Sequence, residues 1–321
     1  MHDAVLKKMP SVQPITGALY DNAAIFGGRL RVTAFGRFYN STTEEEDWTF
    51  SNLRTPEDGK EKDSSLRRYL PQIAKEVGFK ELLVPSPVDF NARVCWEKEL
   101  DTRIPMGGRL TVRRGTNADG CRLQPGQAYA LSAAGCAAIA ACHPVDPHPH
   151  EKVKIAVGHA GLKSLVDEQA ALVGLPSRKP ESITENLLTS MGCSGIKTSR
   201  RKRVGVVIIL PIPSSEFTHP WAHPEWGGDN KRRCGYIAEK WGKSCLPGDE
   251  QDGRIELHEL ITMQFTSLGV PLAHITLLRT RDLFWKTKWQ GKEIWYSTRG
   301  EFSKRRNLII LKHNKIITPA P

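Results

Sequence analysis

Cys136 and His159 are the residues whose types and surroundings best suit chemistry. A thiol beside an imidazole forms a nucleophile–base pair, because the imidazole raises the thiolate fraction. Small residues surround the cysteine in Ala133-Ala-Gly-Cys-Ala-Ala138, and Gly158 and Ala160-Gly161 flank the histidine. The two residues are 23 positions apart, so only the fold can bring them together. The alternative is a small core cysteine and a structural histidine.

The segments around this pair predict how it is positioned. Residues 127–141 read as a buried strand followed by a second strand or a tight turn into one, and Val153–Val157 reads as a further strand. Residues 158–161 then predict a tight strand-to-helix turn, with a helix over 162–172. Turns at the ends of adjacent strands would bring sulfur and imidazole into contact, and a helix start would offer amides to an anion.

The rest of the chain predicts an α+β fold, with mixed β-sheets layered between helices in an α/β/β/α arrangement. Residues 1–25 are expected to be irregular, and residues 26–321 to form a single domain with a Pro- and His-rich loop at 143–150. Apolar spacing predicts further helices at 65–77, from 180 onward and at 256–268, and strands at 30–38, 81–84, 110–113, 204–210, 274–278 and 308–311. The acidic segment 41–63 is expected to be a mobile loop.

Composition sets the broad class. The chain has 321 residues, 39% of them hydrophobic, which excludes collagen-like, coiled-coil and wholly disordered proteins. No run of about 18 apolar residues is present, so no membrane interaction is expected. Seven scattered cysteines and no secretory signal favour reduced thiols and a cytoplasmic location, with the nucleus as the alternative.

The net charge of +11 is concentrated most clearly at Arg200, Arg201, Lys202 and Arg203. This run is either a weak nucleic-acid patch or a solvated loop before the buried strand at 204–210. A surplus of positive charge also suits anionic small substrates.

Two further clusters have an ordinary and a functional interpretation. Three histidines of the Pro-rich loop suit a metal, or belong to an inserted loop: His143, His148 and His150. A group of aromatic residues suits stacking on a purine base, or anchors a loop in the core: Phe217, Trp221, Trp226, Tyr236 and Trp241. His219 and His223 flank Trp221, where surface packing is favoured over a site.

Three segments in order, Asn117–Gly120, Pro125–Cys136 and Val157–Leu165, resemble the core of the YfiH family. That family is also called PgeF, or the multicopper polyphenol oxidoreductase (laccase-domain) family. Weaker likenesses follow the same order and bring the resemblance to residues 30–312: Ser65–Arg68, Leu210–Pro213, Glu256–Val270, Trp295–Arg299 and Arg306–Ile309.

The resemblance implies a fold shared with cysteine-dependent toxin deamidases and a site at Cys136 and His159. It implies action on purine nucleosides, by phosphorolysis with phosphate or by adenosine deamination, with no organic cofactor. It also implies zinc held by the cysteine and two histidines, so Cys136 and His159 would be metal ligands with a third ligand not identified. Asp119 would position the site or only cap a turn.

The chain departs from the family pattern at several positions. The family's Asp before the cysteine is Gly135, its Trp after His-Ala-Gly is Leu162, and its late Cys-Thr is Arg279-Thr280. Its Gln-Val-His has no clear counterpart, and Val94-Cys95 is the nearest piece. These losses leave two alternatives open. One is a cysteine-dependent protein amide deamidase, whose Leu-Ser-Gly-Cys motif residues 131–136 resemble, and the other is a non-catalytic binding protein on the same scaffold.

Overall fold

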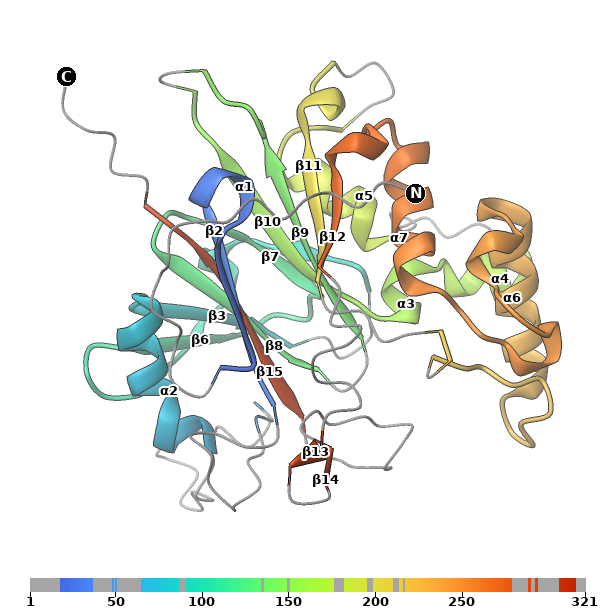
Figure 1. Cartoon of the computed structure of the whole chain (residues 1–321), viewed down its shortest axis with the longest axis horizontal. Coiled ribbons are helices and arrows are strands. Elements are labelled where there is room, and N and C mark those ends of the chain that lie inside the picture. Colours follow the sequence, from blue (N-terminus) through green and yellow to red (C-terminus); the bar gives the residue numbers. More distant parts are fainter. Residues whose placement is uncertain are drawn as a thin grey trace.

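A computed structural model gives the arrangement of most of the chain (Figure 1). It describes residues 18–36, 48, 50, 65–86, 91–133, 136–148, 151–175, 182–194, 199–209, 214–215, 217–278, 288–289, 292–293 and 306–315. The loop predicted over 41–63 lies almost entirely outside these residues.

Strands and short helices alternate along the chain. The strands are β1 (Tyr20–Ala24), β2 (Leu30–Phe35), β3 (Glu81–Pro85), β4 (Val94–Cys95), β5 (Thr102–Pro105), β6 (Thr111–Gly115), β7 (Gly120–Leu123), β8 (Gln127–Ala133), β9 (Ala137–His143), β10 (Lys154–Ala160), β11 (Gly205–Ile209), β12 (Ile275–Leu278), β13 (Lys288–Trp289), β14 (Lys292–Glu293) and β15 (Asn307–His313). The α-helices are α1 (Ile25–Gly28), α2 (Ser65–Val77), α3 (Leu162–Leu165), α4 (Glu168–Val173), α5 (Ile183–Ser190), α6 (Gly227–Trp241) and α7 (Leu257–Ser267).

The strands build two mixed sheets, as predicted. In the described part of the chain, one sheet has seven strands in the order β1-β2-β15-β8-β3-β6-β5, and the other has six in the order β12-β11-β9-β10-β7-β4. Most neighbours are antiparallel, but β3 runs parallel to β6 and β8, β4 to β7, and β11 to β12. Strands β13 and β14 form a separate hairpin.

Alternation along β15 shows why the layers stack as they do. Leu308 and Ile310 belong to the core beneath α2, whereas Ile309 and Leu311 belong to the core between the two sheets. Successive side chains of a strand point to opposite faces. The seven-stranded sheet is therefore covered by helix α2 on one face and by the second sheet on the other.

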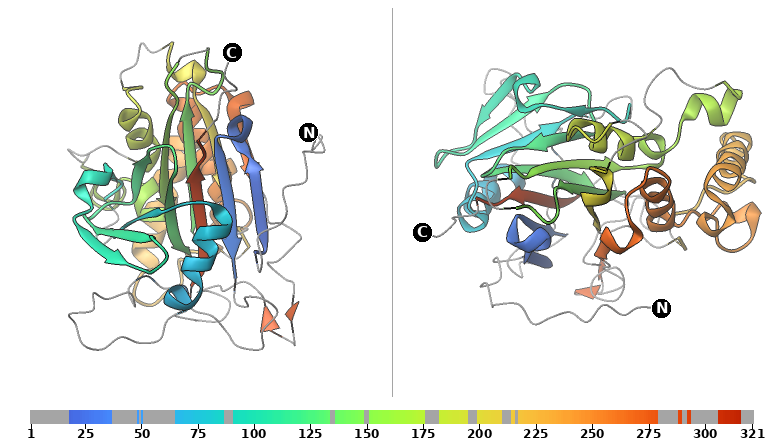
Figure 2. Two further views of the ribbon diagram at one scale, coloured as in Figure 1. Left: turned by 90° about the vertical axis from the view of Figure 1, so that its left-hand side faces the viewer. Right: turned by 90° about the horizontal axis from the view of Figure 1, so that it is seen from above.

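The six-stranded sheet is covered on both faces as well. Its strand β9 is buried along almost its whole length and is built mainly from alanine, which keeps the layers close. Helices α5 and α7 pack in the same core as the strands of this sheet. The views in Figure 2 show the two sheets at the centre of the molecule with helices to either side. The layered α+β arrangement expected from the sequence is confirmed.

Amphipathic segments were the easiest to predict. Helix α2 spans Ser65–Val77 with the expected apolar face buried, and Gly78 follows it with a φ of 84°, a left-handed conformation that suits glycine. Helix α7 and strands β2, β3, β6, β11, β12 and β15 also lie where the apolar spacing placed them.

Two interpretations are wrong here, and one helix was not predicted. Residues 1–25 are not wholly irregular, because β1 pairs antiparallel with β2 at the edge of a sheet. The helix expected over 162–172 is divided into α3 and α4, because Asp167 interrupts it and its carboxylate accepts from the amides of Gln169 and Ala170 as an N-cap. Helix α6 was not predicted, because its buried face includes Asn230 and Arg233, which do not register as apolar.

Candidate active site: Cys136, His159 and Asp119

Cys136 lies in the connection between β8 and β9, where the chain passes from one sheet to the other. Its side chain is half-buried, whereas the other six cysteines, all within the described residues, are buried. Burial raises the pKa of each of those six thiols, to about 12 for Cys95 and Cys142. Cys136 is therefore the thiol placed to react with a molecule from solvent.

His159 lies near the end of β10, as its last residue but one, and not in the turn that the sequence predicted. Strand β10 continues through Ala160, and His159 is the Cα partner of Ala138 on β9. Ala138 is only two residues beyond Cys136. The pairing of β9 with β10 therefore brings the histidine to the end of the sheet where the cysteine lies.

Gly161 shows that the two side chains meet. A Cβ placed on this glycine would lie 3.1 Å from Nε2 of His159 and 3.4 Å from Sγ of Cys136. Both side chains therefore lie against Gly161, and a methyl group there would clash with the imidazole, 2.8 Å from its Cε1. The predicted convergence of thiol and imidazole agrees with this geometry.

Asp119 is the third member of the site. Its Oδ1 lies 3.3 Å from Nδ1 of His159, and its backbone carbonyl accepts from the His159 amide at 2.8 Å. The other carboxylate oxygen accepts from the Ala92 amide at 2.7 Å, and the side chain is fully buried. Of the two roles considered from the sequence, these contacts support positioning of the histidine.

A close approach of two strands places Asp119 there. Gly120 on β7 pairs with Gly158 on β10, and a Cβ on Gly120 would lie 2.3 Å from the carbonyl oxygen of Val157. Only a glycine fits at this position without moving the backbone. Asp119, the residue just before Gly120, is thereby held against His159.

The electrostatics of the site favour a charged imidazole. Burial alone lowers the pKa of His159, but the charge of Cys136, hydrogen bonds to Asp119 and Cys136, and the charge of Asp119 together raise it to about 10. Since Nδ1 faces Asp119, Nε2 is the nitrogen available to the sulfur. An imidazolium there favours the thiolate form of Cys136.

Zinc at Cys136 and His159, with a third ligand not identified, stays a prediction. No group of three or more His, Cys, Asp or Glu side chains in the described part of the chain is arranged to hold a metal ion. Cys136 and His159 would supply two ligands, and a catalytic zinc takes three from the protein. Cys95, the nearest sequence counterpart of the missing ligand, is buried on β4 as the Cα partner of Cys121.

A cavity of about 340 Å³ opens one residue beyond Gly161. Its walls are Leu162, Lys163, Thr218, His219, Pro220, His223, Trp226, Asn230 and Arg233. His223 accepts two backbone amides at Nδ1, so the neutral ring carries its proton on Nε2. Leu162 and Lys163 place this cavity next to His159 along the chain, and apart from its aromatic and histidine residues no local pattern indicated it.

The aromatic group predicted from the sequence is divided between the core and this cavity. Phe217 and Trp241 are buried, and Tyr236 packs edge-on against Trp241. Trp226 is 50% exposed and lines the cavity. The interpretation as core anchors therefore describes most of the group, and Trp226 is placed to contact a ligand.

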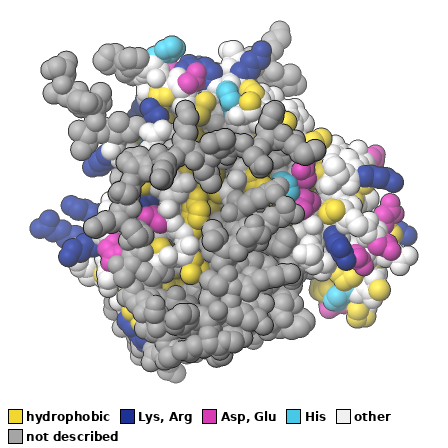
Figure 3. All heavy atoms as spheres, in the orientation of Figure 1, with side chains coloured by type: hydrophobic (Ala, Val, Ile, Leu, Met, Phe, Trp, Pro, Cys, Tyr) yellow, Lys and Arg dark blue, Asp and Glu magenta, His cyan; other side chains and the backbone are white. Residues whose placement is uncertain are grey.

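The basic run 200–203 is partly committed to structure. Arg201 is buried and donates to the carbonyls of Cys193 and Leu268, and Arg203 pairs with Asp146 and Glu151. On the face shown in Figure 3, the described Lys and Arg side chains stand among acidic ones. Two of the four cations are thus neutralised or buried within the fold.

Several predicted features lie outside the described residues: Gly135, His150, 210–213, 279–280 and 295–299. His143 ends β9 and is half-buried, and burial lowers its pKa. The metal site suggested for the loop at 143–150 stays a prediction. In the described segments, no helix is both long and apolar enough to span a bilayer.

Comparison with known proteins gives the fold. No family model and no curated protein matches the sequence. Among solved structures, YfiH of Bacillus licheniformis matches with a TM-score of 0.56 and 14% identity over 89% of this chain and 93% of that one. YlmD of Geobacillus stearothermophilus gives 0.56 and 15% over 91% and 94%. A Neisseria meningitidis protein of family DUF152 gives 0.54 and 13% over 89% and 95%. The chain has the fold that the resemblance implied.

Proposed function

We propose that this chain is a divergent enzyme of the YfiH family that acts on purine nucleosides through Cys136 and His159, with Asp119 positioning the histidine. One observation carries the proposal: the sulfur and Nε2 lie against the same glycine, Gly161, while Nδ1 faces a buried carboxylate. A nucleophile, a proton donor and a group that orients the donor are the parts that nucleophilic catalysis requires.

Deamination of adenosine is the reaction that this pair supports best. The Cys136 thiolate adds to C6 of the purine, and the C6–N1 electron pair moves to N1, which takes a proton from solvent. The bond between C6 and the exocyclic amino nitrogen then breaks, as that nitrogen takes the His159 proton and leaves as ammonia. The imidazole next removes a proton from water attacking C6, sulfur leaves as thiolate, and the hydroxyl proton returns to solvent. The sum is adenosine and water to inosine and ammonia.

Chromatography of adenosine incubated with the protein tests this directly. Wild type is expected to form inosine without added phosphate, and Cys136→Ser is expected to form none. Cys193→Ser, which changes a buried thiol elsewhere, is the matched control and retains activity. Inosine formed equally by Cys136→Ser would refute the thiolate mechanism. Free purine base that appears only with phosphate would instead indicate phosphorolysis, in which His159 serves as the acid.

Amide deamidation is the second candidate, favoured by the same thiolate–imidazolium pair. The bond broken is again carbon–nitrogen, with ammonia leaving from a glutamine carboxamide in place of C6. Ammonia release from a glutamine-containing protein, lost in Cys136→Ser, with no conversion of adenosine, would select this function. Absence of both activities would leave the binding-protein alternative, tested by salt-dependent binding of an oligonucleotide to Arg200 and Lys202.

A further inference from the structure

A second cavity lies at the end of the seven-stranded sheet that is opposite to Cys136. Its three lysines form no ion pair with a carboxylate in the described structure. The cavity measures about 720 Å³, within the range of small-molecule sites. It lies where β8 begins, whereas Cys136 follows the end of β8, so about 20 Å of strand separates the two. Its walls are Gly28, Gly78, Lys80, Glu81, Gln124, Pro125, Gly126, Gln127, Lys312, Asn314 and Lys315.

Three lysines from separate parts of the chain line this cavity. Lys80 precedes β3, Lys312 lies on β15, and Lys315 follows β15. Lys80 and Lys315 are exposed, and Lys312 is half-buried. Within the described residues, no carboxylate forms an ion pair with any of the three.

Lys312 is half-buried, so water compensates its charge less than the charges of the two exposed lysines. Its ammonium donates to the carbonyl of Val77 at 3.0 Å, at the end of helix α2, and such a helix end supplies about half a negative charge. Burial, with a smaller effect from the charge of Arg31, lowers its pKa. Arg31 itself is neutralised by Asp21. A half-buried cation in this setting favours an external anion.

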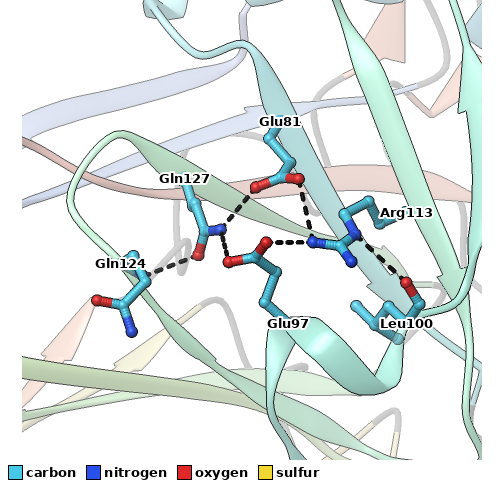
Figure 4. Close-up of polar contacts among 6 residues, drawn as sticks. All are labelled: Glu81, Glu97, Leu100, Arg113, Gln124 and Gln127. Atoms are coloured by element: carbon cyan, nitrogen blue, oxygen red, sulfur yellow. Dashed lines mark hydrogen bonds and ion pairs between the residues drawn. The ribbon is translucent and has the colours of Figure 1, made fainter.

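The one carboxylate in the wall, Glu81, is already engaged (Figure 4). Its Oε2 accepts from Nε2 of Gln127 at 2.6 Å, and its Oε1 pairs with Arg113 at 3.4 Å. Glu97 binds the same two partners from the other side. Glu81 is therefore turned toward this network, and in the described structure it forms no ion pair with the three lysines.

Two glycines leave room for the ammonium groups. A Cβ on Gly78 would lie 3.1 Å from Nζ of Lys312, and a Cβ on Gly126 would lie 2.9 Å from Cε of Lys315. Both glycines have positive φ, 84° and 94°, which other residues rarely adopt. A side chain at either glycine would have to displace the end of the neighbouring lysine.

We propose that this cavity is a second ligand site, which binds a small anion carrying two or more phosphate groups through Lys80, Lys312 and Lys315. Several separated ammonium groups match several linked phosphates, and lysine binds phosphate as a point charge. The site is independent of Cys136 and His159, because it lies at the far end of β8.

Calorimetry with inorganic tripolyphosphate on the full chain tests the proposal. Wild type is expected to bind with one site, more tightly than it binds orthophosphate. Lys312→Met is expected to weaken binding about tenfold or more, the loss of one strong charge-assisted contact. Lys80→Met and Lys315→Met are expected to weaken it a few-fold each, since exposed contacts are screened.

Matched variants show whether binding depends on this cavity in particular. Lys243→Met removes an exposed lysine just after helix α6, and Cys136→Ser alters the proposed active site. Both variants are expected to bind tripolyphosphate as wild type does. Lys312→Arg keeps the charge and is expected to retain most of the binding. If a variant binds weakly, circular dichroism establishes whether it is folded.

Three results would overturn the proposal. The first is that millimolar tripolyphosphate gives neither a heat of binding nor a rise in melting temperature. The second is equal affinity in wild type and Lys312→Met. The third is loss of binding in Cys136→Ser. ATP in place of tripolyphosphate asks whether a nucleotide is the source of the phosphates. A single-stranded oligonucleotide that needs the same lysines while tripolyphosphate does not bind would indicate nucleic acid instead.

Discussion

Two cations near opposite ends of β8, one buried and one half-buried, have opposite fates. Burial disfavours the charge of both His159 and Lys312, and it is the largest influence on each. His159 has Asp119 and Cys136 as partners, and its pKa rises to about 10. Lys312 has a helix carbonyl and a nearby Arg31, and its pKa falls. The comparison indicates that several charged partners together outweigh burial at His159, whereas at Lys312 burial prevails.

Replacing Asp119 is expected to have the largest effect, because it removes the carboxylate that His159 has as a partner and Lys312 lacks. Asp119→Asn keeps the shape but loses the negative charge and the preference for the reactive ring orientation. Activity is expected to fall by roughly 10⁴-fold, the loss typical when the orienting carboxylate of a catalytic triad is neutralised. The measurement is kcat/KM across pH, in which the limb due to His159 should move to lower pH.

The control for this variant is Asp167→Asn, which changes another buried carboxylate that caps α4. It should leave both the rate and the pH profile unchanged at the temperature of assay. A wild-type pH profile in Asp119→Asn would show that the carboxylate does not act on the histidine.

Alkylation of the cysteines comes next in size. Cys136 is half-buried beside an imidazolium, while burial raises the pKa of every other thiol. Iodoacetamide at pH 7 is expected to modify Cys136 at least about 100-fold faster than any other cysteine, because the thiolate is the reactive form. Peptide mass spectrometry of timed samples gives the rates, and His159→Gln should slow the reaction of Cys136 alone. Equal labelling of Cys193 or Cys234 would contradict the assignment.

The pH dependence of stability should distinguish His159 from a histidine without a charged partner. The folded-state pKa of His159 is about 10, above its ordinary 6.5, so its contribution is full below pH 6.5 and is lost as pH rises through about 10. The stability difference between wild type and His159→Gln should therefore shrink between pH 6.5 and 10, by a few kcal/mol at most, as urea unfolding would measure.

His313 is the matched control for that experiment. It is buried, and burial lowers its pKa below the ordinary 6.5. Its folded state therefore resists protonation, so His313→Gln should lose any advantage of the wild type as pH falls below 6.5, the opposite direction. If the stability of His159→Gln and His313→Gln, each relative to wild type, changed with pH in the same direction, the proposed difference between the partners of the two histidines would be refuted.

The smallest effect is expected at Lys312. Lys312→Met removes an incompletely compensated, half-buried charge and keeps the apolar stem, so without ligand it should raise stability by about 1 kcal/mol at neutral pH. The gain should fade as pH approaches 10.5, the ordinary pKa of a lysine, where the wild-type side chain becomes neutral. Thermal unfolding at pH 7 and 10 measures this, with Lys243→Met as the exposed control. A destabilised variant at pH 7 would show that Val77 compensates the charge fully.

Local patterns carried much of the fold. The apolar spacing of residues 65–77 sets one face of α2, and the alternation of β15 sets which residues face each layer. Helix α6 was not predicted from apolar spacing, because one residue of its buried face, Arg233, is polar and forms two hydrogen bonds to Glu168. A polar residue buried by a distant partner has no mark in a local pattern.

The sequence by itself determined which residue types are available: a cysteine among alanines, a histidine between small residues, and an aspartate before a glycine. The tertiary structure alone decided that they meet, through the pairing of β10 with both β9 and β7. It also decided that Lys312 is half-buried without a carboxylate in the described structure, while Asp119 is buried with a histidine. Distances between residues remote in the chain follow from sheet register, and register depends on the packing of the whole core, which no single segment encodes.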